Sequence, residues 1–532
     1  MRGPPISFPD AYAPYPPRNL YVQWVTRVSR PEWYLNCGHR GMASPPKCLS
    51  RQFSRVESSC TILLLTMAWA FCHAAPSAQT ARPGVSIAKS TISYAAARPV
   101  LDALRTKRPL DLSGVDGPAL AAAWPGWVAQ HDADIRARLQ RGDEDSVVNF
   151  WLYGTSFTTS PRATESQRAR IGTERAGTLV ETRLYDLIAG IMAPDNNERL
   201  RFSRRVVERT GVDLALPSGP EHAARALLSM AARMEQELLW YRAGAAAALQ
   251  ANDEAAGLSA YSAYYRGRGL SSDTSILADY AVERALTSLA KSRAAGDAPL
   301  RRVAVVGPGL DFTDKAEGYD FYPAQSLQPF AVIDSLIRLG LARPGDIEVT
   351  TLDVSPRILE HLAAARLRAR SIAGYTLQLP LDADTASHSW HPELVSYWQR
   401  FGDRVGKAVT PASVPSSIEG VRMRAIRLDP TVVDAVVSRD LNIVLERLEP
   451  SSDAARFDLV IATNILVYYD RFDQTLALAN VAHMLRPGGL FLVNSPMFPV
   501  PEMRLSVPQP VTVDFDQQGG DTLFWLRKQP LP

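Results

Sequence analysis

The sequence predicts an α/β fold in which a helical region precedes a mostly parallel sheet covered by helices. Three observations predict it. After residue 299, short β-branched and apolar runs alternate with helical stretches, which is typical of parallel strands joined by crossover helices. A glycine turn follows the first of these strands directly, and the second strand ends in an aspartate. Two runs near the chain end are separated by a Gly-Gly turn, which is typical of an antiparallel hairpin.

The chain length and composition agree with this organisation. With 532 residues, 46% of them apolar and 21% charged, the chain has an ordinary globular composition and room for two or three domains. We expect a leader over residues 1–80, an all-α domain over residues 81–298 and an α/β domain over residues 299–532. Residues 371–420 interrupt the α/β pattern and are expected to be an insertion.

The leader differs from the rest in composition. It holds eight basic and three acidic residues, nine prolines within its first 50 residues, and all four cysteines. It is expected to be disordered, except that residues 47–78 resemble a secretory signal with an apolar stretch over residues 61–71. A signal so far into a chain indicates an over-extended start, and we expect translation to begin at Met42. The alternative for this segment is a short buried helix.

The remaining residues exclude several classes of protein. Residues 81–532 hold 50 basic and 52 acidic residues, so we expect no nucleic-acid partner. The apolar stretch over residues 61–71 is too short to cross a bilayer about 30 Å thick, so we expect no stable membrane insertion. Because residues 81–532 contain no cysteine, they have neither a disulfide nor a thiol nucleophile.

Residues 95–296 are predicted to be mostly helical. A capping box formed by Ser218 and Glu221 begins one helix, and apolar residues at steps of three and four mark its buried face. A second helix is expected over residues 275–293. Nothing in this region indicates a particular chemistry.

The α/β region supplies the strands and helices of the sheet. The expected strands are residues 303–306, 347–352, 421–428, 457–463, 490–494, 511–515 and 522–527. The expected helices are residues 327–341, 357–368 and 471–485. Short β-branched runs predict the strands, and apolar residues at helical spacing predict the helices.

The turn after the first strand is a candidate binding site. Gly307 and Gly309 let the backbone approach a ligand closely, and Asp353 ends the second strand with a carboxylate that can accept both hydroxyls of a ribose. Open parallel sheets bind ligands beyond the carboxyl ends of their strands, so these residues predict a nucleoside site. The alternative is a tight turn followed by an aspartate that caps a helix.

Dinucleotide-dependent dehydrogenases and methyltransferases both use such a crevice. The dinucleotide fingerprint requires a third glycine at the start of the helix. Phe312 stands in that place, and a loop over residues 312–326 delays the helix. An NAD-dependent oxidoreductase is therefore the less favoured class.

The segment over residues 457–494 separates these classes. It resembles the fourth strand, the following helix and the fifth strand of class I S-adenosylmethionine (SAM)-dependent methyltransferases. Over residues 301–500 the chain looks most like the chemotaxis-receptor (CheR-like) glutamate methyltransferases. Their strand ends in an Asn-x-Leu-x-Tyr-aromatic run, which is matched here by Asn464, Leu466, Tyr468 and Tyr469. The resemblance implies a Rossmann-like seven-stranded sheet, SAM as the cofactor and methyl transfer by in-line displacement.

The resemblance also implies contacts with the cofactor. Gly307 and Gly309 would face the methionine part of SAM, and Asp353 would bind the ribose hydroxyls. Asp440 is the candidate for the adenine amino group, with Asp429 as the alternative register.

Two further residues belong to the methyl-transfer end of the implied site. Asn464 would close the pocket near the sulfonium, and Tyr468 would lie close to the transferred methyl group. Asp311, which stands where the family has its third glycine, is counted among the cofactor-binding residues. Val306 replaces an acidic residue and Thr463 an arginine of the chemotaxis enzymes, which argues against a receptor glutamate as the acceptor.

The loop over residues 311–322 is long, acidic and aromatic beside the glycine turn. It is predicted to be a lid or substrate contact that includes Tyr319, Asp320 and Tyr322, and the alternative is that it packs on the helical region. His388 and His391 are three residues apart but have no third ligand spaced nearby, so no metal site is expected.

Three hypotheses for the function follow. The first is a SAM-dependent methyltransferase acting on a small molecule or a protein. The second is a catalytically silent binding module on the same fold, exported from the cell, and the third is an NAD-dependent oxidoreductase. The signal-like segment indicates export, whereas methyltransferase chemistry indicates the cytoplasm.

Overall fold

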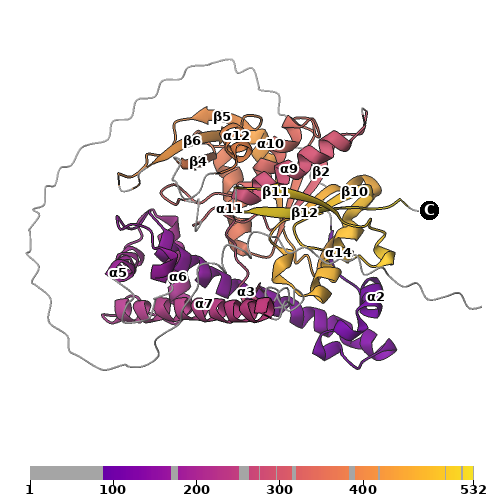
Figure 1. Ribbon diagram of the computed structural model, residues 1–532, viewed down its shortest axis with the longest axis horizontal. Coiled ribbons are helices and arrows are strands. Elements are labelled where there is room, and N and C mark those ends of the chain that lie inside the picture. Colours follow the sequence, from indigo (N-terminus) through magenta and orange to yellow (C-terminus); the bar gives the residue numbers. More distant parts are fainter. Residues whose placement is uncertain are drawn as a thin grey trace, which may run out of the picture. The chain divides into compact units, whose positions relative to one another are not determined.

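A computed structural model describes most of the chain after the leader (Figure 1). The described residues are 88–168, 178–250, 263–265, 267–274, 276–294, 296–313, 319–382, 390–416, 418, 420–497, 499–516 and 519–530. The leader with its signal-like segment and His388 lie outside them. The helical and the α/β regions belong to one compact unit.

Seven strands form a large sheet in the order β11-β12-β10-β9-β2-β3-β7. They are β2 (Arg302–Val306), β3 (Glu348–Asp353), β7 (Val436–Asp440), β9 (Phe457–Ala462), β10 (Leu485–Val493), β11 (Gln509–Asp514) and β12 (Gly520–Arg527). Neighbouring strands from β10 to β7 are parallel, and β12 runs antiparallel to both β10 and β11. The predicted mostly parallel sheet with an antiparallel C-terminal hairpin is confirmed.

One predicted strand lies in a different sheet. Residues 421–428 form β6 (Val421–Leu428), which pairs with β4 (Thr376–Asp382) and β5 (Gly406–Val409) in a three-stranded antiparallel sheet. Together with α12 (Pro392–Arg400), β4 and β5 lie within the expected insertion. The seventh strand of the large sheet is instead β7, a short edge strand with polar residues that the sequence pattern did not reveal.

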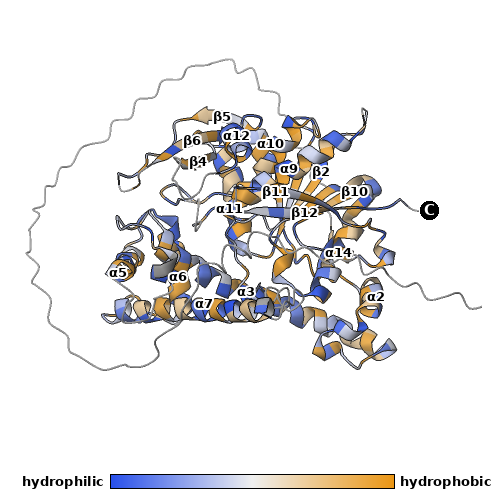
Figure 2. Ribbon diagram, in the orientation of Figure 1, coloured by the Kyte–Doolittle hydropathy of each residue, from blue (hydrophilic) through white to orange (hydrophobic). Residues whose placement is uncertain are grey.

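Alternate residues of the central strands face opposite sides of the large sheet, as strand geometry requires. One face, which includes Val303 and Val305, packs on α9 (Ile276–Ser292) and α10 (Gln328–Arg338). The other face, which includes Ala304 and Val306, packs on α2 (Tyr94–Ala103), the first part of α3 (Gly117–Tyr153) and α14 (Arg471–Met484). Figure 2 shows β2 and β10 as mainly hydrophobic, which agrees with strands buried on both faces.

The helical region is joined to the sheet region from its first residues. β1 (Ala88–Thr91) pairs antiparallel with β8 (Glu446–Glu449), and Trp127 of α3 packs edge-on against Phe472 of α14 with ring centroids 5.8 Å apart. An all-α region is therefore not confirmed. The described residues also form the helices α4 (Glu165–Arg168), α5 (Thr178–Met192), α6 (Glu198–Arg209), α7 (Gly219–Gln250), α11 (Pro356–Ala369) and α13 (Pro430–Asp434). Within the described residues, no helix combines the length and apolar character that a membrane span needs.

Candidate functional site

The glycine turn lies at a topological switch point of the large sheet. From β2 the chain proceeds to β3 and β7 on one side, and later returns to β9 on the other side of β2. In open α/β sheets, the crevice at such a reversal is the usual ligand site. Gly307 follows β2, and Asn464 and Ile465 follow β9, so the residues predicted for the site flank this crevice.

Both glycines of the turn have positive φ angles, 63° at Gly307 and 64° at Gly309. Each is also in close contact with other parts of the chain. A Cβ atom at Gly307 would lie 2.0 Å from Cδ1 of Ile465, and one at Gly309 would lie 2.7 Å from Cβ of Thr274. Glycine is therefore required at both positions by backbone conformation and by space.

Asp353 and Asp440 end adjacent strands. They are partners in the parallel register of β3 and β7, and one oxygen of Asp353 accepts the amide of Ser355 at 2.8 Å. The N-cap residue of α11 is Ser355, so this bond closes a local turn before the helix and does not cap the helix itself. Burial raises the pKa of the Asp353 carboxyl to about 7, and the charge of Asp440 acts in the same direction. The other carboxylate oxygen of Asp353 can accept a ribose hydroxyl, and a carboxyl group that ionises near neutral pH is compatible with such a contact.

Asp440 is ion-paired with the N-terminal part of the chain. Arg136 of α3 lies 2.9 Å from its Oδ1 and Lys89 of β1 lies 3.8 Å from its Oδ2, while the carboxylate keeps 47% of its surface exposed. Asp429, the alternative for the adenine contact, precedes α13 and follows β6 in the smaller sheet. Of the two candidates for the adenine contact, Asp440 and not Asp429 therefore lies beside Asp353.

Asn464 adopts a left-handed conformation with φ 59°, which is uncommon for a residue other than glycine. Its amide donates to Oδ1 of Asn494 at 2.8 Å, and Nδ2 of Asn494 donates back to its side-chain oxygen at 2.6 Å. Asn494 also donates to Asp521 at 3.0 Å. This network fixes the end of β9, and strain of this kind is typical of functional sites.

Tyr468 lies on the side of the site that faces the helical region. Its ring meets the ring of Tyr265 edge-on at 5.5 Å, and its carbonyl accepts a hydrogen bond from Arg138 of α3 at 2.9 Å. Burial raises the pKa of the Tyr468 phenol above its usual value. The phenol is therefore a neutral group at physiological pH and suits positioning rather than proton abstraction.

The predicted substrate loop is bound to α6. The buried guanidinium of Arg199 donates to the carbonyls of Asp311 (3.1 Å), Phe312 (2.6 Å), Asp320 (3.1 Å) and Tyr322. The Asp311 carboxylate is buried and accepts the Tyr322 hydroxyl at 2.9 Å. These contacts favour the packing alternative for the loop.

The side chains of Asp320 and Tyr319 also face the helical region. The Asp320 carboxylate accepts hydrogen bonds from the hydroxyls and amides of Thr155 and Ser156. Tyr319 stacks against the guanidinium of Arg162. The described side chains of the loop that were proposed for the site therefore all contact other residues of this chain. They are Asp311, Tyr319, Asp320 and Tyr322.

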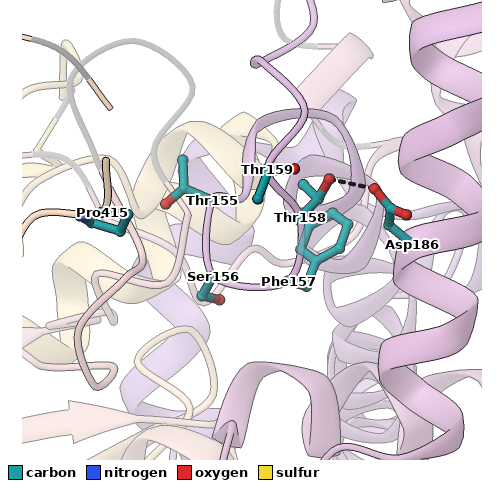
Figure 3. A pocket seen from close by; sticks show the side chains of 7 residues that line it. All are labelled: Thr155, Ser156, Phe157, Thr158, Thr159, Asp186 and Pro415. Carbon is teal, nitrogen blue, oxygen red and sulfur yellow. Dashed lines mark hydrogen bonds between the residues drawn. The ribbon is translucent and has the colours of Figure 1, made fainter. Parts of the chain in front are cut away.

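A shallow cavity of about 490 Å³ lies next to this loop (Figure 3). It is lined by Thr155, Ser156, Phe157, Thr158, Thr159, Asp186 and Pro415. The Thr158 hydroxyl bonds to Asp186, and those of Thr155 and Ser156 bond to Asp320. None of the residues that line this cavity belongs to the glycine turn, so the cavity is not part of the site there.

Helix α9 carries another buried polar group. Asp279 of α9 is 2% exposed, and its carboxyl group lies beside the side-chain amide of Gln328. Burial raises its pKa to about 8, and Gln328 offsets only part of this effect. Gln328 donates to the hydroxyl of Thr463 at 3.0 Å, directly before Asn464. Sequence reasoning missed Asp279, because its position on an apolar helix face gives no sign of what surrounds it.

Sequence reasoning also missed the residues of α3 that reach the site, such as Arg136 and Arg138. One available signal was Gly142, since a glycine inside a helix often marks a close approach. A Cβ atom there would lie 1.8 Å from the carbonyl oxygen of Leu270. No group of three or more His, Cys, Asp or Glu side chains within the described ranges is placed to hold a metal ion.

Comparisons with known proteins show similarity in structure alone. No family model matches the sequence, and no curated protein matches it. The N-methyltransferase NodS from Bradyrhizobium japonicum WM9 is 12% identical, with 48% of this chain and 96% of that chain covered and a TM-score of 0.23. Magnesium protoporphyrin IX methyltransferase (ChlM) from Synechocystis PCC 6803, solved with bound SAM, is 8% identical over 48% and 81%, with a TM-score of 0.24.

A third similar structure is the 1,6-didemethyltoxoflavin-N1-methyltransferase from Burkholderia thailandensis, 14% identical over 48% of this chain and 80% of that chain, with a TM-score of 0.22. None of these three is a chemotaxis-receptor methyltransferase, and the closer resemblance to that family is not supported.

Proposed function

We propose that this protein is a SAM-dependent methyltransferase whose site is the crevice at the switch point between β2 and β9. One observation carries the proposal. The glycine turn after β2, Asp353 after β3 and the strained Asn464 after β9 meet at one edge of a sheet that reverses its strand order there. This is the edge at which open α/β sheets bind nucleotides.

On this proposal, two carboxylates bind the nucleoside part of SAM. Asp353 would accept the ribose hydroxyls, and Asp440, beside it in the register, would meet the adenine amino group. Gly307, Gly309 and Asp311 would line the methionine side. The cofactor would supply an electrophilic methyl group bound to a sulfonium sulfur, and this sulfur is the leaving group, as a neutral thioether.

Catalysis on this proposal consists mainly of positioning. In-line displacement requires the acceptor atom and the methyl carbon to be aligned about 3–3.5 Å apart. Asn464, held by Asn494, and Tyr468, held by Arg138 and Tyr265, would form the walls that align them. A base is needed only if the acceptor carries a proton at neutral pH. The acceptor is proposed to be a small molecule or a protein, and no nucleic acid.

The first test is calorimetric titration of the full-length protein with S-adenosylhomocysteine, the demethylated product, with NADH as the control ligand. We expect binding of S-adenosylhomocysteine alone with Kd in the micromolar range, about −8 kcal/mol. Asp353→Ala should weaken it at least about tenfold, by about 1.4 kcal/mol. Asp429→Ala is the matched control and should bind as the wild type does. Equal affinity in Asp353→Ala would contradict the ribose assignment.

One observation favours a second candidate, the catalytically silent binding module. The faces of Gly307 and Gly309 that a ligand would contact are occupied by Ile465 and Thr274. On this candidate the turn is a structural junction, and the titration would show no binding of either nucleoside ligand. The proposed export through residues 47–78 belongs with this candidate, and the cytoplasm belongs with the methyltransferase.

A further inference from the structure

Residues 267–274, which we call the strap, lie across the glycine turn. The amide of Leu310 donates to the carbonyl of Ser272 at 2.7 Å, and the amide of Thr274 donates to the carbonyl of Leu310 at 2.9 Å. Asp273 and Leu310 form a parallel bridge. Because Thr274 contacts Gly309, the strap covers the face of the glycine turn that the proposed cofactor would contact.

The strap is also bound to the start of α11, directly after Asp353. The hydroxyl of Ser272 donates to the hydroxyl of Ser355 at 3.1 Å. Arg357 lies 3.8 Å from the carboxylate of Asp273, and its guanidinium packs over the rings of both Phe202 and Phe312, at 3.9 and 4.0 Å from their centroids. These rings fix Arg357, and Arg357 in turn favours one position of Asp273.

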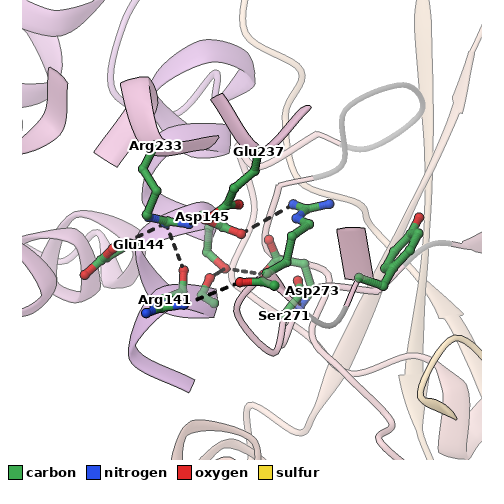
Figure 4. A network of polar contacts seen from close by, with 12 residues as sticks. Arg141, Glu144, Asp145, Arg233, Glu237, Ser271 and Asp273 are labelled. Carbon is green, nitrogen blue, oxygen red and sulfur yellow. Dashed lines mark hydrogen bonds and ion pairs between the residues drawn. The ribbon is translucent and has the colours of Figure 1, made fainter. Parts of the chain in front are cut away.

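A third set of contacts binds the strap to α3 (Figure 4). The amide of Leu270 donates to the carbonyl of Arg138 at 3.1 Å, and the hydroxyl of Ser146 donates to Asp273 at 3.1 Å. Asp145 lies 2.5 Å from Arg233 of α7 and 3.4 Å from Arg268 of the strap. The strap therefore links the helical region to both halves of the proposed cofactor site.

The contacts that hold the strap differ in kind from those that hold the sheet. The strap pairs with the turn over one bridge and makes polar side-chain contacts with α3 and with the start of α11, and it places one apolar side chain, that of Leu270, in the core. Segments with few apolar contacts open locally at a small fraction of the global unfolding free energy. Opening of the strap would free the face of Gly309 without unfolding the sheet.

We propose that the strap closes the SAM site over the glycine turn, so that the closed strap and the cofactor exclude each other, with Asp273 as the residue that positions the strap. This inference rests on the proposed function. It accounts for a glycine turn that has the backbone angles of a ligand loop and yet contacts Thr274. A protein closed in this way binds its ligand less tightly in proportion to the fraction of molecules that are open.

The first experiment loosens the strap. Asp273→Asn in the full-length protein removes the charge that faces Arg357. The matched control is Asp434→Asn, which removes ion pairs with Arg366 of α11 and with Arg370, the residue that follows α11. We expect Asp273→Asn to bind S-adenosylhomocysteine about 3–10-fold more tightly than the wild type and the control to be unchanged. A residue with a merely structural role would instead weaken binding or leave it unchanged.

The second experiment fixes the strap in the closed position with a disulfide, and it can be interpreted even if the Asp273→Asn variant does not fold. The pair Ser272→Cys and Ser355→Cys is placed in a full-length chain whose native cysteines are serines. The replaced cysteines are Cys37, Cys48, Cys60 and Cys72. Oxidation should form the crosslink, as mass spectrometry would show, and should lower the affinity for S-adenosylhomocysteine at least about 100-fold. Reduction of the same sample should restore binding.

Each result decides between the proposals. Full binding by the crosslinked protein, or failure of the crosslink to form, would overturn the closed strap and leave the cofactor site standing. Loss of binding on crosslinking with unchanged or weaker binding by Asp273→Asn would overturn the role of Asp273 alone. If the wild type and every variant fail to bind, the proposed function fails, and the strap proposal fails with it.

Discussion

Asp353 and Asp440 lie side by side at the ends of β3 and β7, and Arg136 of the distant helix α3 neutralises the second of them. Two carboxylates at adjacent strand ends would repel each other if both were charged. The ion pair on Asp440 and the raised pKa of Asp353 relieve this repulsion in different ways. The site is thus arranged so that Asp353 gains its charge near neutral pH.

The affinity for S-adenosylhomocysteine should therefore depend on pH through Asp353. The ionised carboxylate accepts ribose hydroxyls, and burial keeps the pKa of the group at about 7. Below that pH the affinity should fall up to about tenfold for each pH unit, and above it the affinity should level off. Calorimetry across this range measures the effect. Asp353→Asn should remove the dependence, and a wild-type affinity that is constant below pH 7 would contradict the assignment.

Gly142→Ala should destabilise the protein by about 2–4 kcal/mol. A Cβ atom at this position would overlap the carbonyl of Leu270, and backbone cannot yield as a flexible side chain does. Gly126 in the same helix has nothing within 4 Å, so Gly126→Ala is the matched control. The control should stabilise the protein by up to about 1 kcal/mol, because alanine favours the helix. Urea unfolding of both variants measures the difference, and equal effects would show that the strap does not pack on α3.

Arg199→Met should lower the unfolding free energy by about 3–5 kcal/mol. The substitution keeps apolar volume but leaves four buried carbonyl groups of the loop without their donor. Arg205→Met, on the exposed side of the same helix, should change it by less than about 0.5 kcal/mol. A small effect at Arg199 in thermal unfolding would indicate that the loop is held by other contacts.

Asp279 should make the protein less stable as the pH rises from about 4 towards 8. Its pKa is raised to about 8 by burial, so the folded protein keeps a proton that the unfolded chain releases above its ordinary pKa near 3.8. Stability then falls with rising pH by up to about 1.4 kcal/mol per pH unit over this window. Asp279→Asn, which is neutral throughout, should flatten this slope in urea unfolding at several pH values. An unchanged slope would assign the effect to another group.

The sequence predicted those strands whose own residue pattern reflects how they are buried. The strands β2 and β9 are apolar runs because both faces are buried, and each ends at a residue with an unusual role, Gly307 or Asn464. β7 was missed because it is a five-residue strand at the sheet edge, with one polar and two charged residues. The longer and more apolar β6 was assigned to the large sheet in its place, although it pairs elsewhere.

The site was predictable to the same extent. Asp353 and the glycines follow strand ends, and this position alone predicts where they meet. Arg136 and Asp440 are 304 positions apart, and no periodicity relates residues at such a distance. The contact of Thr274 with Gly309 depends on a chain path that spacing does not encode. The sequence therefore predicted the sheet edge at which the site lies, but it did not predict which segments of the chain cover that site.

The pairing of β1 with β8 also has a consequence for synthesis of the chain. The hydroxyl of Ser90 bonds to the carboxylate of Glu449, 359 positions later, and the first helices cover a sheet face completed by β10 and β12. At about 5–20 residues per second, roughly 20–70 s pass before those partners leave the ribosome. During that time the apolar side of α2 and α3 faces solvent, which makes the nascent chain a substrate for chaperones and makes the folding rate dependent on distant contacts.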